Sequence, residues 1–328
     1  MEKQKVIIGA DISKKTIDLS LHPCGSHLTI SNDPVGFKQM IQWLRKSKVE
    51  CQQAILVMEH TGWYSSHFER FLFKSGIQFS KVNPVDIKYT IGIARGKSDK
   101  IDAARIAKYA AEKPDRLKPC EPPSKAQEDL SMLNTSRDKL VRIRAGLKNS
   151  IEAFKSAGLP NSHPAVMTQL KVIKTLDKQI TELDDEIKKT IQAEQDLKNN
   201  YNLLTSICGI GPVVATNMLV KTQNFSRFNR GRKFSCYCGI APFEHSSGTS
   251  IRGKRRVSHM ADKGMKTLLN LAAQIAIQRD PEIRDFYQRK VGSGYAKMSV
   301  LNIVRNKLVA RMFAVIKRQT PYIIIAAA

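Results

Sequence analysis

The sequence predicts an α/β N-terminal domain with a mixed sheet, followed by mainly helical segments. Short apolar runs alternate with helix-like spacings in the N-terminal third, where three strands precede alternating helices and strands. Leu and Ile repeats at helical spacing fill the middle of the chain, and amphipathic helices over 263–279 and 298–318 end it. At 328 residues, two or three domains are expected. We divide the chain into residues 1–115, 116–200 and 201–328.

The chain is strongly basic, with a formal net charge of +25. This excess favours a polyanionic partner, most simply nucleic acid. It is concentrated in residues 201–328, which hold 21 Lys and Arg against 5 Asp and Glu. The six cysteines form no Cys-x-x-Cys pair, which predicts reduced thiols in a cytoplasmic protein. We expect no membrane partner, since there is no signal peptide and no apolar run nears the roughly 18 residues of a span.

Two of the predicted N-terminal strands end in an acid. Strands are expected over 6–11, 16–21, 28–30, 54–59 and 77–82, with helices over 37–44 and 61–73. Asp11 and Glu59 each follow a run of apolar residues, where a carboxylate is costly unless it is paired or metal-bound. Ligands gather at strand ends in open α/β sheets. Each acid alone also fits a structural role in a cap or turn.

A helix that begins near residue 98 adds two more carboxylates. Ser98 suits the cap of this helix, and Asp99 and Asp102 lie three apart on one of its faces. Two such carboxylates repel each other unless a cation lies between them, and hard oxygen ligands suit Mg²⁺. The alternative is a solvated acidic helix start. Joined with Asp11 and Glu59, the pair predicts a four-carboxylate site of the kind used in metal-assisted phosphoryl transfer.

The middle of the chain predicts two long helices. The proline-rich residues 114–123 indicate a hinge. Leu133, Leu140 and Leu147 then repeat every seven residues, and residues 173–187 carry apolar side chains at three-four spacing after a break over 158–160. This pattern predicts an antiparallel coiled coil that mediates oligomerisation. An ordinary helical hairpin packed on the rest of the protein is the alternative.

The basic C-terminal segment contains two motifs suited to nucleic acid. Gly209 and Gly211 flank Ile210 in a stretch similar to a helix-hairpin-helix element, whose backbone N–H groups approach a phosphate; a simple turn is the alternative. Ser247 lies on a predicted loop before a glycine, where its hydroxyl could attack a phosphodiester held by arginines. A polar surface loop is the alternative. The basic residues expected to contact nucleic acid are Arg230, Arg232, Lys233, Arg252, Lys254, Arg255 and Arg256.

Taken together, these motifs resemble the DEDD-type insertion-sequence transposases with a catalytic serine. These proteins are also called bridge-RNA-guided recombinases, and the Piv-type DNA invertases are their relatives. In the N-terminal half the resemblance is carried by Asp11, by Glu59 in Glu-His-Thr-Gly-Trp-Tyr, and by residues 97–103. In the C-terminal half it is carried by residues 209–212 and by residues 239–242, which precede Ser247 and its glycine. It covers nearly the whole chain.

The resemblance implies a RuvC-like, ribonuclease-H-type domain in which Asp11, Glu59, Asp99 and Asp102 hold Mg²⁺. It implies a C-terminal transposase domain in which Ser247 forms a covalent link to DNA, with the adjacent Ser246 as the alternative nucleophile. Strand exchange and religation would then need no external energy source. The implied partners are target and donor DNA, a structured non-coding bridge RNA that pairs with both, and further copies of the chain in a tetramer made of two dimers.

Two other functions fit the same residues. The first is a metal-only, structure-selective nuclease of the RuvC type, which would use the four carboxylates and water without a covalent intermediate. The second is a non-catalytic nucleic-acid scaffold, for which the basic C-terminal segment would suffice. Metal binding that depends on the carboxylates separates the scaffold from the enzymes, and trapping of a protein–DNA adduct separates the nuclease from the recombinase.

Overall fold

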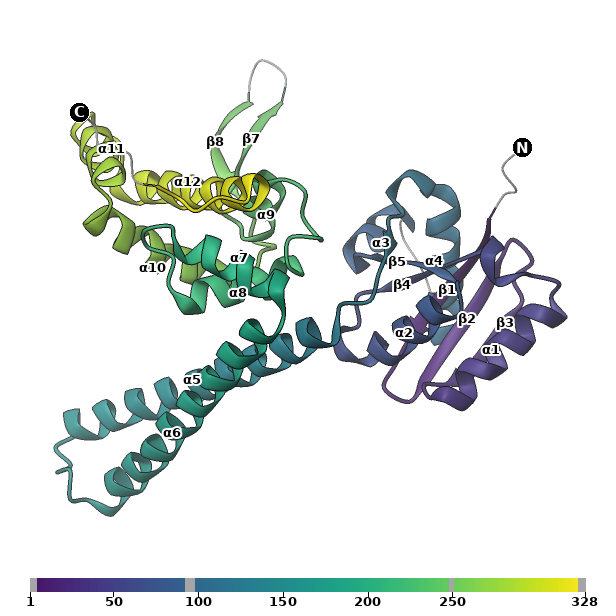
Figure 1. The fold of residues 1–328 in the computed structure, drawn as a ribbon, viewed down its shortest axis with the longest axis horizontal. Helices are drawn as coiled ribbons and strands as arrows, with labels where there is room; N and C mark the ends of the chain where they lie inside the picture. The colour runs from purple at the N-terminus through teal and green to yellow at the C-terminus, as the bar shows by residue number, and fades with distance from the viewer. Residues whose placement is uncertain (1–4, 92–97, 248–250, 324–328) are drawn as a thin grey trace. The chain divides into compact units, whose positions relative to one another are not determined.

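A computed structural model of the chain describes residues 5–91, 98–247 and 251–323, without the side chains of residues 91, 245–247 and 251–255. The chain forms two compact units, Met1–Pro122 and Pro123–Ala328, which we call the N-terminal unit and the C-terminal unit (Figure 1). Each unit encloses hydrophobic clusters of its own.

The N-terminal unit is built on a six-stranded mixed sheet of order β3-β2-β1-β4-β5-β6. The parallel pairs are β1–β4 and β4–β5, whereas β1–β2, β2–β3 and β5–β6 are antiparallel. The strands are β1 (Val6–Ile12), β2 (Thr16–His22), β3 (His27–Ser31), β4 (Ala54–Glu59), β5 (Gln78–Val82) and β6 (Pro119–Cys120). The central strands β1 and β4 are almost wholly apolar because helices cover both faces of the sheet.

The two faces of the sheet carry different helices. On one face, α1 (Pro34–Lys46) and α2 (Ser66–Lys74) pack against Ile8 and Met58. On the other, α3 (Pro84–Ile91) and α4 (Asp99–Glu112) pack against Val57 and Ile7. Short 3₁₀ helices lie at η1 (Cys51–Gln53), η2 (Gly62–Ser65) and η3 (Pro114–Arg116). The sheet is therefore the middle layer of three.

The C-terminal unit begins with a long helical hairpin. Helices α5 (Lys125–Ser156) and α6 (Pro164–Ala193) pack along each other and are joined by a short turn, so they run antiparallel (Figure 1). Ion pairs cross between them from Arg137 to Asp184 and, at 2.6 Å, from Arg144 to Asp177. These partly exposed pairs join the two helices but add little to stability.

Six further helices among the described residues pack around the main core of the C-terminal unit. They are α7 (Gln195–Thr205), α8 (Pro212–Thr222), α9 (Gly231–Tyr237), α10 (Lys263–Arg279), α11 (Pro281–Gly292) and α12 (Lys297–Arg318). Their apolar faces meet in a cluster that includes Leu204, Leu269 and Leu308, all fully buried. None of the described helices is both long enough and apolar enough to cross a membrane.

The serine segment forms strands rather than the predicted loop. Strands β7 (Pro242–Ser247) and β8 (Ile251–Val257) pair antiparallel, with Ser246 opposite Arg252 and Ser247 opposite Ile251. The register shifts between Phe243 and His245. The many polar and basic residues of this stretch hid its strand character, because they carry no regular alternation of apolar and polar side chains.

The mixed sheet with surrounding helices and the mainly helical C-terminal unit agree with the sequence prediction. The expected helix over residues 61–73 is divided into η2 and α2, and part of the predicted hinge over residues 114–123 forms η3 and β6. The short strand β6 was not predicted, because a two-residue strand between prolines carries no periodic pattern.

Candidate active site

Asp11 and Glu59 lie beside each other on neighbouring parallel strands. The register of β1 and β4 pairs Ala10 with Met58, so each acid is the next residue on its strand. Because side chains alternate between the faces of a sheet, both acids share the face of Val57, which α3 and α4 cover. The strand-end pattern in the sequence thus corresponds to two adjacent carboxylates.

Asp99 and Asp102 lie in the first turn of α4, which packs on β1, β2 and β4. The Ser98 hydroxyl caps this helix as the sequence predicted, since its Oγ accepts a hydrogen bond from the Ile101 N–H at 3.3 Å. Asp102 accepts a hydrogen bond from Arg105 Nη1 at 2.8 Å. That contact restricts the rotation of the Asp102 carboxylate.

Gly9 allows α4 to lie very close to β1. A Cβ on Gly9 would lie 2.1 Å from the carbonyl oxygen of Ala103 and 2.4 Å from the backbone nitrogen of Ala107. Only a residue without a side chain permits this approach. Gly9 is two residues before Asp11 and hence on the same face of β1. The close packing therefore brings the acidic first turn of α4 toward Asp11.

The neighbouring carboxylates shift the pKa values of two of these acids, Asp11 and Glu59. Burial raises the pKa of Asp11, and the charges of Asp99, Asp102 and Asp18 raise it further. Burial also raises the pKa of Glu59, with further contributions from Asp11 and Asp102. Carboxylates from β1, β4 and α4 thus act on one another electrostatically, as groups that share one site do.

Asp18 is a buried acid that the sequence analysis did not single out. It lies opposite Asp11 in the register of β1 and β2, and it is 7% exposed. Its Oδ1 accepts a hydrogen bond from the Thr29 hydroxyl at 2.6 Å and lies 3.0 Å from His27 Nε2. These partners satisfy Asp18 within the sheet, so we assign it a structural role. The signal in the sequence was an acid inside the alternating run of β2.

The donor set suits a hard divalent cation. Carboxylate oxygens are preferred ligands of such ions, and a cation would relieve the repulsion that raises the pKa values of Asp11 and Glu59. Among the described residues, however, no three Asp, Glu, His or Cys side chains are grouped closely enough to hold a metal ion. The four acids are thus electrostatic neighbours here and do not form a closed cage.

The predicted serine nucleophile belongs to the C-terminal unit, whereas the four acids belong to the N-terminal unit. Ser247 is the last residue of β7 and Ser246 precedes it. The side chains of both serines, and those of Arg252, Lys254 and Arg255 on β8, lie outside the described part of the structure.

The base of the β7–β8 ribbon is anchored to the core of the C-terminal unit. The Ile240 carbonyl accepts hydrogen bonds from the side-chain amides of Asn302 and Asn306, at 2.8 and 2.9 Å. On the other side, Asp262 accepts hydrogen bonds from the Tyr237 hydroxyl at 3.0 Å and pairs with Lys221 at 2.9 Å. The serine-bearing ribbon therefore projects from a rigid support (Figure 1).

The two glycines of the helix-hairpin-helix-like stretch have different surroundings. Gly209 has a φ of +91°, and a Cβ there would lie 2.6 Å from the Ala272 carbonyl oxygen of α10. Close packing and backbone conformation thus account for Gly209. Gly211 precedes α8, and a Cβ there would meet no atom within 4 Å. Gly211 is the better placed of the two for a phosphate to approach.

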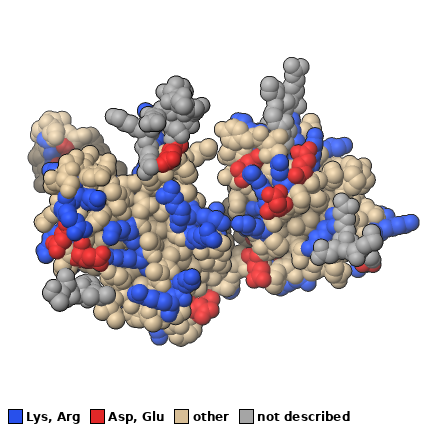
Figure 2. All heavy atoms as spheres, turned by 90° about the horizontal axis from the view of Figure 1, so that it is seen from above, with Lys and Arg blue, Asp and Glu red and all other residues tan. Residues whose placement is uncertain are grey.

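Several predicted nucleic-acid contacts lie on the surface of the C-terminal unit. Arg230, Arg232 and Lys233 surround the start of α9 and are exposed, as is Arg256 on β8. Lys and Arg side chains recur across the visible face of the molecule in Figure 2. This distribution suits contacts with a phosphate backbone.

Comparison with known families accounts for most of the chain. Residues 8–154 match the transposase model for the IS110 DEDD domain, and residues 201–288 match the model described as transposase IS116/IS110/IS902 family. The first match contains all four acids on β1, β4 and α4, and the second contains the serine ribbon. The chain belongs to the IS110/IS116 family of transposases. It is an enzyme of the transposase and recombinase class, and this activity implies DNA binding.

Individual relatives extend the similarity over most of the chain. The pilin gene-inverting protein of Moraxella bovis is 27% identical, over 97% of this chain and 98% of its own length. The transposase for insertion sequence element IS1111A of Coxiella burnetii is 25% identical, over 80% of this chain and 78% of its own length. The DEDD domain implies a divalent metal ion.

Proposed function

We propose that this transposase is an RNA-guided DNA recombinase that cleaves and exchanges strands through a covalent phosphoserine intermediate. The observation that carries the proposal is the electrostatic proximity of Asp11 and Glu59 to the Asp99–Asp102 turn, where burial and mutual repulsion raise the pKa of the first two. We assign Mg²⁺ to these four carboxylates. A bound ion would supply positive charge against the charge that develops on the phosphate during transfer.

Ser247 is the proposed nucleophile, with Ser246 as the alternative. In the proposed step the serine hydroxyl loses its proton and its oxygen bonds to phosphorus. The bond from phosphorus to one bridging oxygen of the strand breaks, and that strand end leaves as a hydroxyl with the proton. One phosphoester replaces another, so the reverse reaction with a new strand end can religate DNA without further energy input.

The proposal extends to partners. The net charge of +25 suits both DNA and a structured non-coding RNA that would pair with target and donor DNA. Backbone contacts are assigned to Gly211 and to the exposed Arg230, Arg232, Lys233 and Arg256. The hairpin of α5 and α6 is proposed as a coiled coil that joins protomers into a tetramer. In that assembly the acids of one protomer would meet the serine of another.

Trapping the adduct tests the proposed chemistry. The full chain is mixed with labelled donor DNA and Mg²⁺ and then denatured, and protein-linked DNA is measured on a gel. We expect the adduct with the unmodified chain, none with Ser247→Ala, and a strong loss with Asp11→Asn, while both variants still bind DNA. Ser293→Ala, at an exposed serine after α11, is the matched control. An adduct that persists in Ser247→Ala and disappears in Ser246→Ala would move the assignment to Ser246.

A metal-only nuclease is the second candidate, because all four acids lie in one unit and the serine lies in the other. It predicts free DNA ends and no adduct in the same assay. Sequencing of RNA that copurifies with the chain tests the guide separately: recovery of one structured RNA supports it, and recovery of mixed cellular RNA contradicts it. Mass measurement of the purified chain tests the tetramer.

A further inference from the structure

A pocket in the C-terminal unit combines aromatic rings with basic side chains. It has a volume of about 680 Å³, within the range of about 300–1,000 Å³ typical of small-molecule sites. It lies between the segment that leads into α9 and one face of α12. The lining residues that matter for its chemistry are Phe225, Phe228, Arg230, Arg232, Phe313 and Lys317.

The apolar part of this pocket is a set of half-buried rings. Phe225 and Phe313 meet edge to face with their centroids 5.1 Å apart, and Phe313 also lies 6.0 Å from the buried ring of Phe234. Phe228 also packs against Phe234, with the ring centroids 5.3 Å apart. The buried ring of Phe234 thus joins the cluster to the core, while Phe225, Phe228 and Phe313 remain partly exposed and line the pocket.

Phe225 is held in the pocket by an unusual backbone. Gln223, Asn224 and Phe225 have φ values of 49°, 52° and 67°, a left-handed conformation that a bulky residue rarely adopts. The Thr222 hydroxyl oxygen, which is fully buried, accepts a hydrogen bond from the Phe225 N–H at 3.0 Å. Strained backbone of this kind is concentrated at active sites and ligand-binding sites.

The charged side chains among the described residues that line the pocket are all basic. Arg230, Arg232 and Lys317 are exposed basic residues, and none of the described residues that line the pocket is acidic. Arg232 donates to the Pro242 carbonyl at 3.0 Å, which fixes its position at the base of the serine ribbon. No ion pair holds Arg230 or Lys317 among the described residues. The site therefore suits an anion that also has a flat apolar part.

The space in the pocket depends on two small residues of α12. Ala310 and Ala314 lie one helical turn apart on either side of Phe313, and both are exposed.

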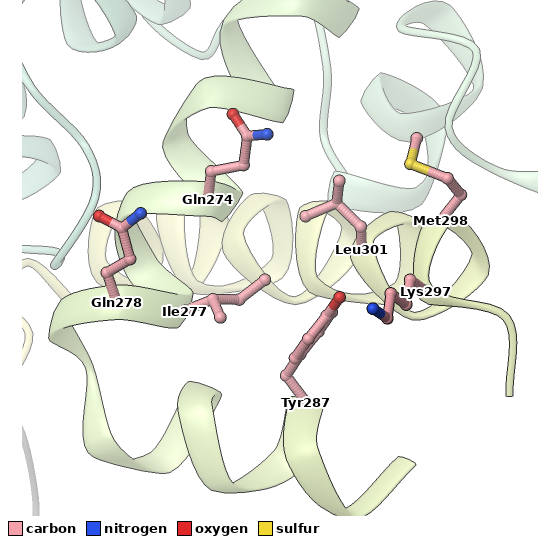
Figure 3. Close-up of a pocket in the computed structure, with 7 residues that line it drawn as sticks. All are labelled: Gln274, Ile277, Gln278, Tyr287, Lys297, Met298 and Leu301. Atoms are coloured by element: carbon pink, nitrogen blue, oxygen red, sulfur yellow. The ribbon is translucent and has the colours of Figure 1, made fainter. Parts of the chain in front are cut away.

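A second pocket, between α10, α11 and α12, differs in chemistry. In Figure 3 its Gln274 and Gln278 amides lie on one helix, and a single ring, Tyr287, reaches toward Lys297. That pocket has one cation and no ring cluster, and it serves as the control.

We propose that the pocket of Phe225, Phe228 and Phe313 binds one unpaired nucleotide of a DNA strand. The base lies against the rings, and its phosphate lies on Arg230 and Lys317. Stacking on aromatic rings inside a basic groove is how proteins hold single strands without reading their sequence. The inference rests on the proposed recombinase function, since strand exchange exposes unpaired nucleotides. Arg232 links the pocket to the ribbon that carries the serines.

Binding of single-stranded DNA by the full chain tests this assignment. The affinity for a labelled oligo-dT strand is measured by fluorescence anisotropy at a fixed salt concentration. The affinities for duplex DNA and for an RNA strand are measured in the same way. We expect Phe313→Leu to weaken binding of the DNA strand about tenfold, with little effect on the duplex. Ala314→Leu should weaken it similarly by filling the pocket, at an exposed helical site where Leu is well tolerated. Tyr287→Leu and Lys297→Gln, from the second pocket, should leave it unchanged.

Photocrosslinking locates the base directly. A strand with one 5-iodouracil is irradiated on the full chain, and the linked peptide is identified by mass spectrometry. Crosslinks to Phe225, Phe228 or Phe313 are expected. Crosslinks confined to other peptides, unchanged affinity in Ala314→Leu, or a ring effect on RNA alone would each overturn the proposal. If these pocket experiments fail but the Ser247-dependent adduct forms, the recombinase proposal stands and only the nucleotide pocket is refuted. If the adduct does not form, the recombinase proposal fails, and the crosslinks still report on the pocket independently.

Discussion

Replacement of Gly9 by Ala tests the packing that gathers the acids. The new Cβ would lie 2.1 Å from the Ala103 carbonyl oxygen and 2.4 Å from the Ala107 nitrogen. Carbon–oxygen contacts close at about 3.3 Å, so α4 must move away from β1 by about 1 Å. Both clashing atoms belong to helix backbone, so no side-chain rotation can relieve them. Overpacking of this kind costs about 1–3 kcal/mol.

Two measurements follow from that displacement. The melting temperature of the N-terminal unit should fall by about 8 °C for a loss of about 2 kcal/mol. At a temperature where Gly9→Ala remains folded, adduct formation should slow by about a hundredfold, because a shift of about 1 Å at a catalytic group has that effect. The shift moves Asp99 and Asp102 away from Asp11.

Gly146→Ala is the matched control for this substitution. Gly146 lies within α5, and a Cβ there would meet no atom within 4 Å. Alanine should therefore stabilise that helix by roughly 0.5–1 kcal/mol and leave the adduct rate unchanged. If Gly9→Ala melts at the temperature of the unmodified chain and forms adduct at the same rate, the close approach of α4 does not position the acids and our reading of Gly9 is wrong.

Two further predictions concern charges in the N-terminal unit. In the folded chain the pKa values of Asp11 and Glu59 are raised above their ordinary values of 3.8 and 4.5. Without metal, the stability that these two acids contribute is therefore fully present below their ordinary pKa values. It is lost as the pH rises through the raised pKa values of the folded chain. In a chelator, Asp11→Asn should therefore melt above the unmodified chain by a margin that grows from about pH 4 to pH 7 and shrinks when Mg²⁺ is added; a margin independent of pH would contradict the pKa shift. Glu69 is 2% exposed and pairs with Lys81 at 2.6 Å between α2 and β5. Glu69→Gln should therefore lower the free energy of unfolding by about 3 kcal/mol in denaturant titrations. The double variant Glu69→Leu with Lys81→Met should recover most of this lost stability. Equal losses in the single and double variants would show that packing, and not charge, holds this position.

The parts of the fold that the sequence predicted are those with a strong local pattern. β1 and β4 are nearly unbroken apolar runs, and the cap at Ser98 is a local hydrogen bond. The β7–β8 ribbon was missed because its residues are largely polar and basic and its pairing depends on a partner strand. Local periodicity does not report such pairing.

The site shows the same division. Asp11 and Glu59 could be identified from the sequence because each follows an apolar strand, where a carboxylate is costly unless it is paired or metal-bound. Gly9 stayed hidden, since its importance comes from the backbone of α4, far along the chain. Asp18 also stayed hidden, because its partners His27 and Thr29 come from β3, the next strand of the sheet. Tertiary contacts, and not residue types, decide these two positions.

All six strands of the central sheet are complete by Cys120, just before the boundary at Pro122 and Pro123. Domains generally fold as units during synthesis, the N-terminal one first. The acid-bearing half can therefore reach its native state on the ribosome while the serine-bearing half is still being translated. A message cut short after Pro122 would still encode all the strands of this sheet and its carboxylates, but the fragment would lack both the serine ribbon and the basic residues assigned to nucleic acid, so it could not complete a reaction.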